Sequence, residues 1–178
     1  MDWYDAIPKW VRKYKRTIRS ITGIVPTKLL GSGGFGYAYR TSNPKKVLKI
    51  TTHRAEAKTC AAIMQLRRRY GSQLFPSVVK IYHISHVAAH SPPAKIFLIV
   101  REYTQAKDWG LNEPEDNILK ETIEELKSYK IYAWDVYSGN IGLARARLGK
   151  RKKGDPVLFD PTADCRTGKV KIPHFEIG

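Results

Sequence analysis

A glycine-rich segment, residues 30–40, restricts this chain more than any other feature. It reads LGSGGFGYAYR, which gives the spacing G-x-G-x-x-G with an aromatic residue before the last glycine. Glycine can adopt positive φ angles, and it lets backbone N–H groups approach phosphate oxygens closely. Dinucleotide-binding folds and ordinary tight hairpins share this spacing, so the residues that follow must separate the possibilities.

The segment after the glycines favours strands over a helix. A dinucleotide fold needs a helix directly after its glycines, although Glu56 does supply an acid at about the distance that such a fold requires. Residues 37–40 are instead typical of a strand, residues 41–44 of a turn, and residues 47–50 of a second strand. A glycine turn between strands, followed by a strand that carries an inward lysine, is the arrangement with which protein kinases cover ATP.

Lys49 is the lysine that this interpretation requires. It lies two residues after Val47 and therefore on the same strand face. We expect Ala38 and Val47 to cover the adenine and Lys49 to bind phosphates. The alternative is a strand lysine that is only solvated.

Residues 52–70 predict a helix with Thr51 or Thr52 as its N-cap. Glu56 falls on the inward stripe of this helix, where a carboxylate is costly unless it is paired. Lys49 is the natural partner and would complete the lysine–glutamate pair of kinases. Alternatively, Glu56 only stabilises the helix dipole from the first turn.

The first 23 residues predict an amphipathic helix that starts near Pro8 and ends before Gly23. Its apolar residues recur at helical spacing and its cations fill the other side: Trp3, Ile7, Trp10, Val11, Tyr14 and Ile18 against Lys9, Arg12, Lys13, Lys15, Arg16 and Arg19. We expect it to pack on the first lobe. A membrane-surface helix has the same pattern.

The middle of the chain predicts two more strands and a second helix. The strands are residues 78–85 and 96–101, and the continuous apolar run of the latter predicts burial on both faces. Residues 102–104 would form the hinge that meets the adenine edge, with Glu102 and Thr104 as binding positions. Residues 113–130 predict a helix with Leu119, Ile123 and Leu126 inward.

A second group of polar residues follows. Asp135 precedes Asn140 by five residues, a strand follows, and after another strand-like run at 157–159 comes Asp160. In a kinase catalytic loop the first Asp accepts the proton of the substrate hydroxyl, and the Asn and the later Asp hold Mg²⁺. We therefore expect Asp135 to be the catalytic base, with Lys49 and Glu56 as its catalytic partners, and Asn140 and Asp160 to be the metal ligands.

In this order, residues 27–165 resemble the protein kinase-like superfamily. Residues 30–40, 134–141 and 159–162 are most similar to the early serine/threonine kinase of short-tailed lytic phages, a family with the loop D-x-x-S-G-N-I and an Asp-Pro in place of D-F-G. The resemblance implies a protein serine/threonine kinase that uses ATP and Mg²⁺ and modifies host proteins in the host cytoplasm. The glycines that would bind the phosphates are Gly31, Gly33, Gly34 and Gly36.

The expected architecture is a minimal bilobal α+β fold. An N-terminal basic helix (1–26) would precede a kinase N-lobe (27–105) with a five-stranded antiparallel sheet and one main helix. A truncated helical C-lobe (106–178) would follow, because only eighteen residues come after Asp160. We expect the usual peptide-binding half to be missing, so substrate recognition would come from elsewhere.

Some residues depart from the kinase pattern and keep other functions open. Ala133 and Trp134 occupy the His and Arg places before the catalytic Asp, and Tyr137 stands where many serine/threonine kinases have Lys. A pseudokinase scaffold that binds a host protein or nucleic acid is one alternative, and a small-molecule kinase is another. Retention of Lys49 and the three polar residues 135, 140 and 160 argues against the scaffold.

The net charge of +16 favours polyanionic partners. Residues 145–153 (RARLGKRKK) carry six cations, and they would dock an acidic substrate or nucleic acid, or simply form a solvated hairpin tip. The two cysteines have no metal spacing, so we expect free thiols in a reducing cytoplasm. No apolar run approaches eighteen residues, and neither a membrane span nor secretion is expected.

Overall fold

The computed structural model describes residues 3–33, 36–69, 78–85, 95–106, 112–133, 140–144, 152–158, 163–165, 170, 172 and 174–176. The chain divides into two compact units. The first unit holds residues 1–54, 80–101 and 172–178, and the second holds residues 55–79 and 102–171. The domain boundaries predicted at residues 26 and 105 stay predictions.

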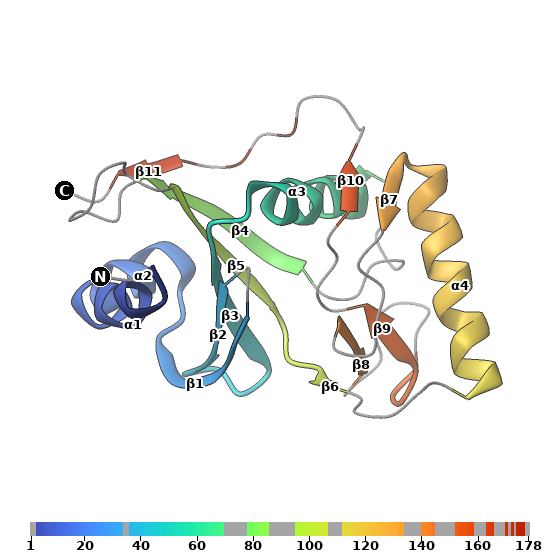
Figure 1. The fold of residues 1–178 in the computed structure, drawn as a ribbon, viewed down its shortest axis with the longest axis horizontal. Coiled ribbons are helices and arrows are strands. Elements are labelled where there is room, and N and C mark those ends of the chain that lie inside the picture. The colour runs from blue at the N-terminus through green and yellow to red at the C-terminus, as the bar shows by residue number, and fades with distance from the viewer. Residues whose placement is uncertain are drawn as a thin grey trace. The chain divides into compact units, whose positions relative to one another are not determined.

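The first unit is built on one six-stranded sheet preceded by two helices (Figure 1). The strand order is β1-β2-β3-β5-β4-β11. Its elements are α1 (Trp3–Lys13), α2 (Lys15–Thr22), β1 (Pro26–Gly33), β2 (Gly36–Thr41), β3 (Lys46–Thr51), β4 (Val78–Ser85), β5 (Lys95–Glu102) and β11 (His174–Glu176).

The five strands predicted from the sequence all lie in this sheet, but the expectation of a five-stranded antiparallel sheet is wrong in two respects. A sixth strand, β11, joins the edge, and it runs parallel to β4 with His174 opposite His83. A three-residue edge strand is too short to show the alternation by which strands are recognised, which is why the sequence did not reveal it.

The N-terminal segment forms two helices where one was predicted. The helix begins at Trp3, five residues before Pro8, and is interrupted at Tyr14. Burial explains the early start, because Ile7 is only 1% exposed and would lose its packing if the helix began at Pro8. The predicted end is confirmed: Gly23 caps α2 in the left-handed conformation, at φ 74°, and its N–H donates to the carbonyl of Arg19.

The apolar stripe of α1 and α2 packs into the first unit, as expected. Ile7, Trp10, Val11 and Ile18 are all at most 5% exposed. The face of β2 that carries Tyr39 lies near α1, because the charge of Arg12 acts on the Tyr39 hydroxyl.

β5 is buried along its whole apolar run, as the sequence predicts. Residues 96–100 are each at most 4% exposed, so both faces of the strand are covered. The run ends in Arg101, which is itself only 7% exposed. A cation at the end of a buried strand is unusual, and Arg101 has a polar or electrostatic partner.

The second unit combines two helices with two small sheets (Figure 1). One sheet has the order β6-β8-β9 and the other pairs β10 with β7. The elements are α3 (Arg54–Arg69), β6 (Gln105–Ala106), α4 (Glu113–Ser128), β7 (Ile131–Ala133), β8 (Ile141–Leu143), β9 (Pro156–Leu158) and β10 (Ala163–Cys165).

One apolar cluster joins α3, α4, β7 and β8. Its buried members are Ala62, Ile63, Leu119, Leu126, Ile131 and Ile141. The predicted inward residues of α4 are confirmed, with Ile123 partly buried at the margin of the cluster. α4 begins with a capping box, in which the Asn112 side chain accepts from the N–H of Glu115 at 2.9 Å and the Glu115 carboxylate accepts from the N–H of Asn112 at 2.9 Å.

The predicted cap of α3 is wrong. The helix begins at Arg54, so neither Thr51 nor Thr52 stands directly before it. Thr51 is instead the last residue of β3, and its hydroxyl accepts from the N–H of His53 at 3.0 Å. Threonine side chains make such local turns as readily as helix caps, and the sequence alone does not separate the two.

Among the described residues, no helix has the length and apolarity to cross a membrane.

Gly36 is the glycine on which the β2–β3 pairing depends. Its φ is +153°, and a Cβ at this position would overlap the carbonyl oxygen of Ile50. We expect Gly36→Ala to lower the free energy of unfolding by roughly 1–3 kcal/mol, the usual cost of a strained backbone position. Gly31→Ala is the matched control, because a Cβ there meets nothing within 4 Å. Urea unfolding measures both, and equal stability of the two variants would contradict this role of Gly36.

Tyr39 should make stability fall at alkaline pH. Burial chiefly raises its pKa above the ordinary 10.0, Tyr37 adds to the rise, and Arg12 opposes it. The folded state therefore holds the proton more tightly, so this stabilisation is complete below pH 10 and is lost as the pH rises through the folded pKa. Tyr39→Phe should flatten that loss.

At neutral pH the same change should be nearly neutral, since the Tyr39 hydroxyl is buried without a hydrogen-bond partner in the described part of the chain. Tyr132→Phe, at a side chain that is 38% exposed, is the control. Urea unfolding at pH 7, 9 and 11 measures the slopes. A Tyr39→Phe protein with the wild-type loss between pH 9 and 11 would refute the assignment.

Candidate functional site

Three residues of the predicted phosphate site form a row across the first unit's sheet. Ala38 of β2 lies directly opposite Lys49 of β3 on one side and opposite Gly31 of β1 on the other. Directly opposed residues of antiparallel strands share a face of the sheet. Gly31, Ala38 and Lys49 therefore lie side by side on one face, and the prediction that the glycine segment and the lysine come together is supported by the register.

The glycines at the end of the β1–β2 pair differ in whether the backbone requires them. Gly33 and Gly36 are opposed at the end of the β1–β2 pair, on either side of residues 34–35. Gly36 is required by the backbone, as shown above, whereas Gly31 and Gly33 have ordinary φ angles and open space where a Cβ would stand. Both are exposed. Their missing side chains leave the backbone of β1 accessible to a ligand.

Lys49 is a buried cation, not a solvated one. It is 7% exposed, and Val47, on the same face two residues earlier, is 4% exposed. Ala38 is half-buried. The simple alternative of a solvated strand lysine is therefore wrong, because a long cationic side chain is rarely covered unless it is paired. Lys49 does have a polar or electrostatic partner.

Arg101 is a second buried cation; the sequence marks it as an unusual residue beside the expected hinge but did not predict its burial. It belongs to the first unit, as Lys49 does, and each of the two is 7% exposed. Its place directly after an entirely apolar run was the available signal that this residue is special, because a strand that is buried on both faces normally excludes a charged side chain. The candidate site thus lies in a sheet that buries two cations.

Glu56 is the first site residue of the second unit. It is 1% exposed in the first turn of α3, and it has a polar or electrostatic partner. The predicted inward position is confirmed, and the place of Glu56 in the first turn also keeps the alternative of an interaction with the helix dipole. Burial at this level marks Glu56 as part of a polar arrangement rather than a surface charge.

Asn140 and the expected hinge also belong to the second unit. Asn140 is 5% exposed and stands immediately before β8, which pairs with β9 as an antiparallel hairpin. This confirms the predicted strand after Asn140 and the strand near 157–159. Glu102 ends β5 and Thr104 precedes β6, and both are half-buried. The backbone of residues 102–104 thus connects two strands, as a hinge segment must.

Several predicted residues lie outside the described part of the chain. They are Gly34, Asp135 and Asp160, together with most of the basic segment 145–153. Of that segment only Lys152 and Lys153 are described, and both are exposed. The roles of these residues stay predictions from sequence spacing.

The oxygen-rich site expected for Mg²⁺ rests on two residues. No group of three or more His, Cys, Asp or Glu suited to a metal ion occurs among the described residues. The predicted ligands are of another kind, one amide (Asn140) and one carboxylate (Asp160), which suit a Mg²⁺ ion that keeps water and phosphate oxygens as its other ligands. The buried amide of Asn140 fits this expectation.

Comparison with known proteins identifies a class of fold. No protein-family model matches the sequence, and no curated protein matches it. The structure is similar to that of a protein kinase, which supports a protein kinase-like fold. One such solved structure is the MAP kinase LmaMPK10 from Leishmania major, with a TM-score of 0.52 and 12% sequence identity. The match covers 86% of this chain and 50% of the kinase, so the chain spans about half the length of that protein.

Proposed function

We propose that this chain is an ATP- and Mg²⁺-dependent phosphotransferase, a phage-type serine/threonine protein kinase that modifies host proteins. The observation that carries the proposal is the row of Gly31, Ala38 and Lys49 on one sheet face. Glycines with open Cβ positions, two strands away from a buried lysine on the same sheet face, are suited to phosphate oxygens, which backbone N–H groups and an ammonium group would bind. The kinase-like fold supports the same function.

Each site residue has a role in this proposal. Lys49 would hold the phosphates while Ala38 and Val47 cover the adenine, and the backbone at Glu102 and Thr104 would meet its edge. Glu56 would orient the lysine. ATP supplies the phosphoryl group, and bound Mg²⁺ neutralises charge on its oxygens.

In the catalytic loop, Asp135 would accept the proton of the substrate hydroxyl. Asn140 and Asp160 would hold the metal, which suits their oxygen donors. The roles of Asp135 and Asp160 rest on their spacing in the sequence. Ala133 and Trp134, which replace the usual His and Arg, imply an enzyme without control by activation-loop phosphorylation.

Lys49→Met should abolish most phosphate binding. Methionine fills a similar volume, but removing one member of a buried charged pair costs about 3–5 kcal/mol of stability, so binding is measured well below the melting temperature of the variant. Lys45→Met is the matched control, because Lys45 is exposed just before β3. Calorimetry with ATP and Mg²⁺ should show at least about tenfold weaker binding for the first variant only, the loss expected for one charge-assisted hydrogen bond of about 1.5–3 kcal/mol.

If Lys49→Met and Lys45→Met bind ATP equally well, Lys49 is a structural cation and the nucleotide site is elsewhere. Thermal melting of both variants separates this result from misfolding. A wild-type protein that binds no ATP at all would favour a scaffold without nucleotide.

Substitutions of Asp135 and Asp160 should affect ATP binding and phosphate transfer differently. Asp135→Asn should lower phosphate transfer by roughly 10²–10⁴-fold with ATP binding nearly intact, because it acts on the incoming hydroxyl. Asp160→Asn should instead weaken Mg²⁺-dependent ATP binding as well as turnover. Incubation with labelled ATP, Mg²⁺ and a host lysate measures transfer, and calorimetry with and without Mg²⁺ measures binding.

Full transfer by Asp135→Asn would remove this residue from the mechanism. An ATP affinity that is equally dependent on Mg²⁺ in wild type and Asp160→Asn would reject Asp160 as a ligand. Phosphate transfer to a small hydroxyl compound, but not to any protein, would show that the chain is a small-molecule kinase rather than a protein kinase.

A further inference from the structure

The N-terminal part of the chain has an extreme charge pattern. Residues 6–55 contain twelve Lys and Arg residues and not one Asp or Glu. The first unit as a whole holds fifteen Lys and Arg residues against three acids, a net charge of +12 out of the chain's +16. Such a segment repels itself and has no acids of its own to neutralise it.

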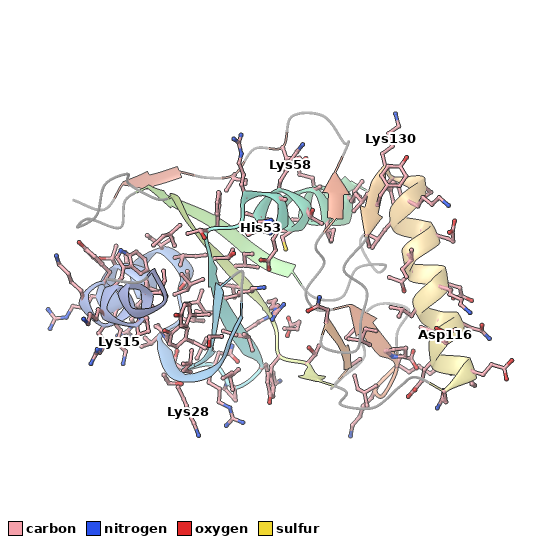
Figure 2. All side chains as sticks on the ribbon, viewed as in Figure 1. Lys15, Lys28, His53, Lys58, Asp116 and Lys130 are labelled. Carbon is pink, nitrogen blue, oxygen red and sulfur yellow. The ribbon has the colours of Figure 1, made fainter. Side chains whose placement is uncertain are left out.

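The two N-terminal helices concentrate this charge on one exposed surface. Of the seven exposed residues between Ile7 and Thr22, six are cations, and the seventh is Ser20. These six residues, here named the α1–α2 cationic face, are Lys9, Arg12, Lys13, Lys15, Arg16 and Arg19. Figure 2 shows Lys15 of α2 and Lys28 of β1 projecting away from the ribbon of the first unit.

Four apolar side chains of these helices, Ile7, Trp10, Val11 and Ile18, are at most 5% exposed. A membrane-surface helix must insert apolar residues between lipids, and these four are already covered by protein. Protein interfaces likewise have apolar or aromatic centres and few lysines. The exposed large hydrophobic residues of the described chain are Leu29, Leu30 and Tyr132, none of which lies on these helices.

The spacing of the cations fits a polyanion of high charge density. Six cations occur within the eleven residues from Lys9 to Arg19, so the positive charge is dense along the two helices. Double-stranded DNA carries one phosphate charge per about 1.7 Å of its axis. A helix with cations on its flanks also fits between the two phosphate strands that border a groove.

We propose that the α1–α2 cationic face binds double-stranded nucleic acid through its phosphate backbone, without reading the base sequence. This activity is independent of the proposed kinase site, because none of its residues belongs to that site. Binding of this kind releases counterions, so the affinity falls steeply with salt. It would keep the protein on nucleic acid and close to partners that are bound there.

The test uses the full chain and a labelled DNA duplex of 20 base pairs. The variant is Lys15→Gln/Arg16→Gln/Arg19→Gln, which removes three exposed cations of α2. The matched control, Lys120→Gln/Lys127→Gln/Lys130→Gln, removes three exposed cations of the second unit. Fluorescence anisotropy between 50 and 200 mM salt should show that the α2 variant loses about a hundredfold or more in affinity at the lowest salt. The slope of log K against log salt should become less steep by about 3, since each lost phosphate contact contributes about 0.9.

Three further measurements complete the design. The charge-conserving variant Arg16→Lys/Arg19→Lys should bind as the wild type does, which separates a loss of charge from a loss of folding. Two duplexes of unrelated sequence should bind equally, and a duplex should bind more tightly than a single strand of the same length.

Any of several results would overturn the proposal. Equal losses for the α2 variant and the control would show that only net charge matters. Binding to vesicles that contain phosphatidylserine, with no binding to the duplex at 50 mM salt, would assign the face to a membrane surface. A preference for the single strand would contradict the argument from charge spacing.

Discussion

The close approach of β2 to β3 at Gly36 is the constraint on which the candidate site depends. A side chain at this position would overlap the Ile50 carbonyl, so only glycine lets the two strands pair in the observed register. A slip of one residue would turn every side chain of β2 to the opposite face of the sheet. Tyr37 or Tyr39 would then replace Ala38 opposite Lys49, and a bulky ring would fill the place where the hairpin now faces the lysine.

The first unit uses its cations in two physically different ways. Lys49 is covered by protein, where an uncompensated charge is expensive, and it lies in a segment of fifty residues without any acid. An acidic partner for Lys49 would therefore have to come from outside that segment. The cations of α1 and α2 remain in water, where each costs little to hold but all of them repel one another. A buried cation defines a site for one small ligand, whereas a row of exposed cations suits an extended polyanion.

The sequence predicted most strands of the sheet, because the underlying signals are local, whereas the register that forms the row comes from the structure. The glycine spacing, the alternation of Tyr37 and Tyr39 with Ala38, and the apolar run of β5 each follow from strand geometry. The sequence failed where long-range packing decides. The α1 helix begins before Pro8 because Ile7 is buried, and β11 exists only because β4 offers it an edge.

The remaining site predictions differ in kind. The burial of Glu56 was correctly predicted from its place on an inward helical stripe. The burial of Arg101 was not predicted, although its place directly after the apolar run of β5 was a local signal. Asp135 and Asp160 rest on spacing alone, and spacing states an order along the chain rather than a distance in space.

The glycines themselves separate what the fold needs from what a ligand needs. Gly36 is explained completely by the backbone, so its presence says nothing about phosphate. Gly31 and Gly33 have ordinary φ angles, are exposed, and have room for a side chain. Strand residues with such freedom are normally larger, because glycine weakens a strand by its backbone entropy and its lack of packing. Gly31 lies where the β1–β2 register is irregular, and such bulges often carry glycine, whereas Gly33 stands opposite Gly36 at the end of the strand pair. At both positions the missing side chain leaves open space beside the backbone of β1.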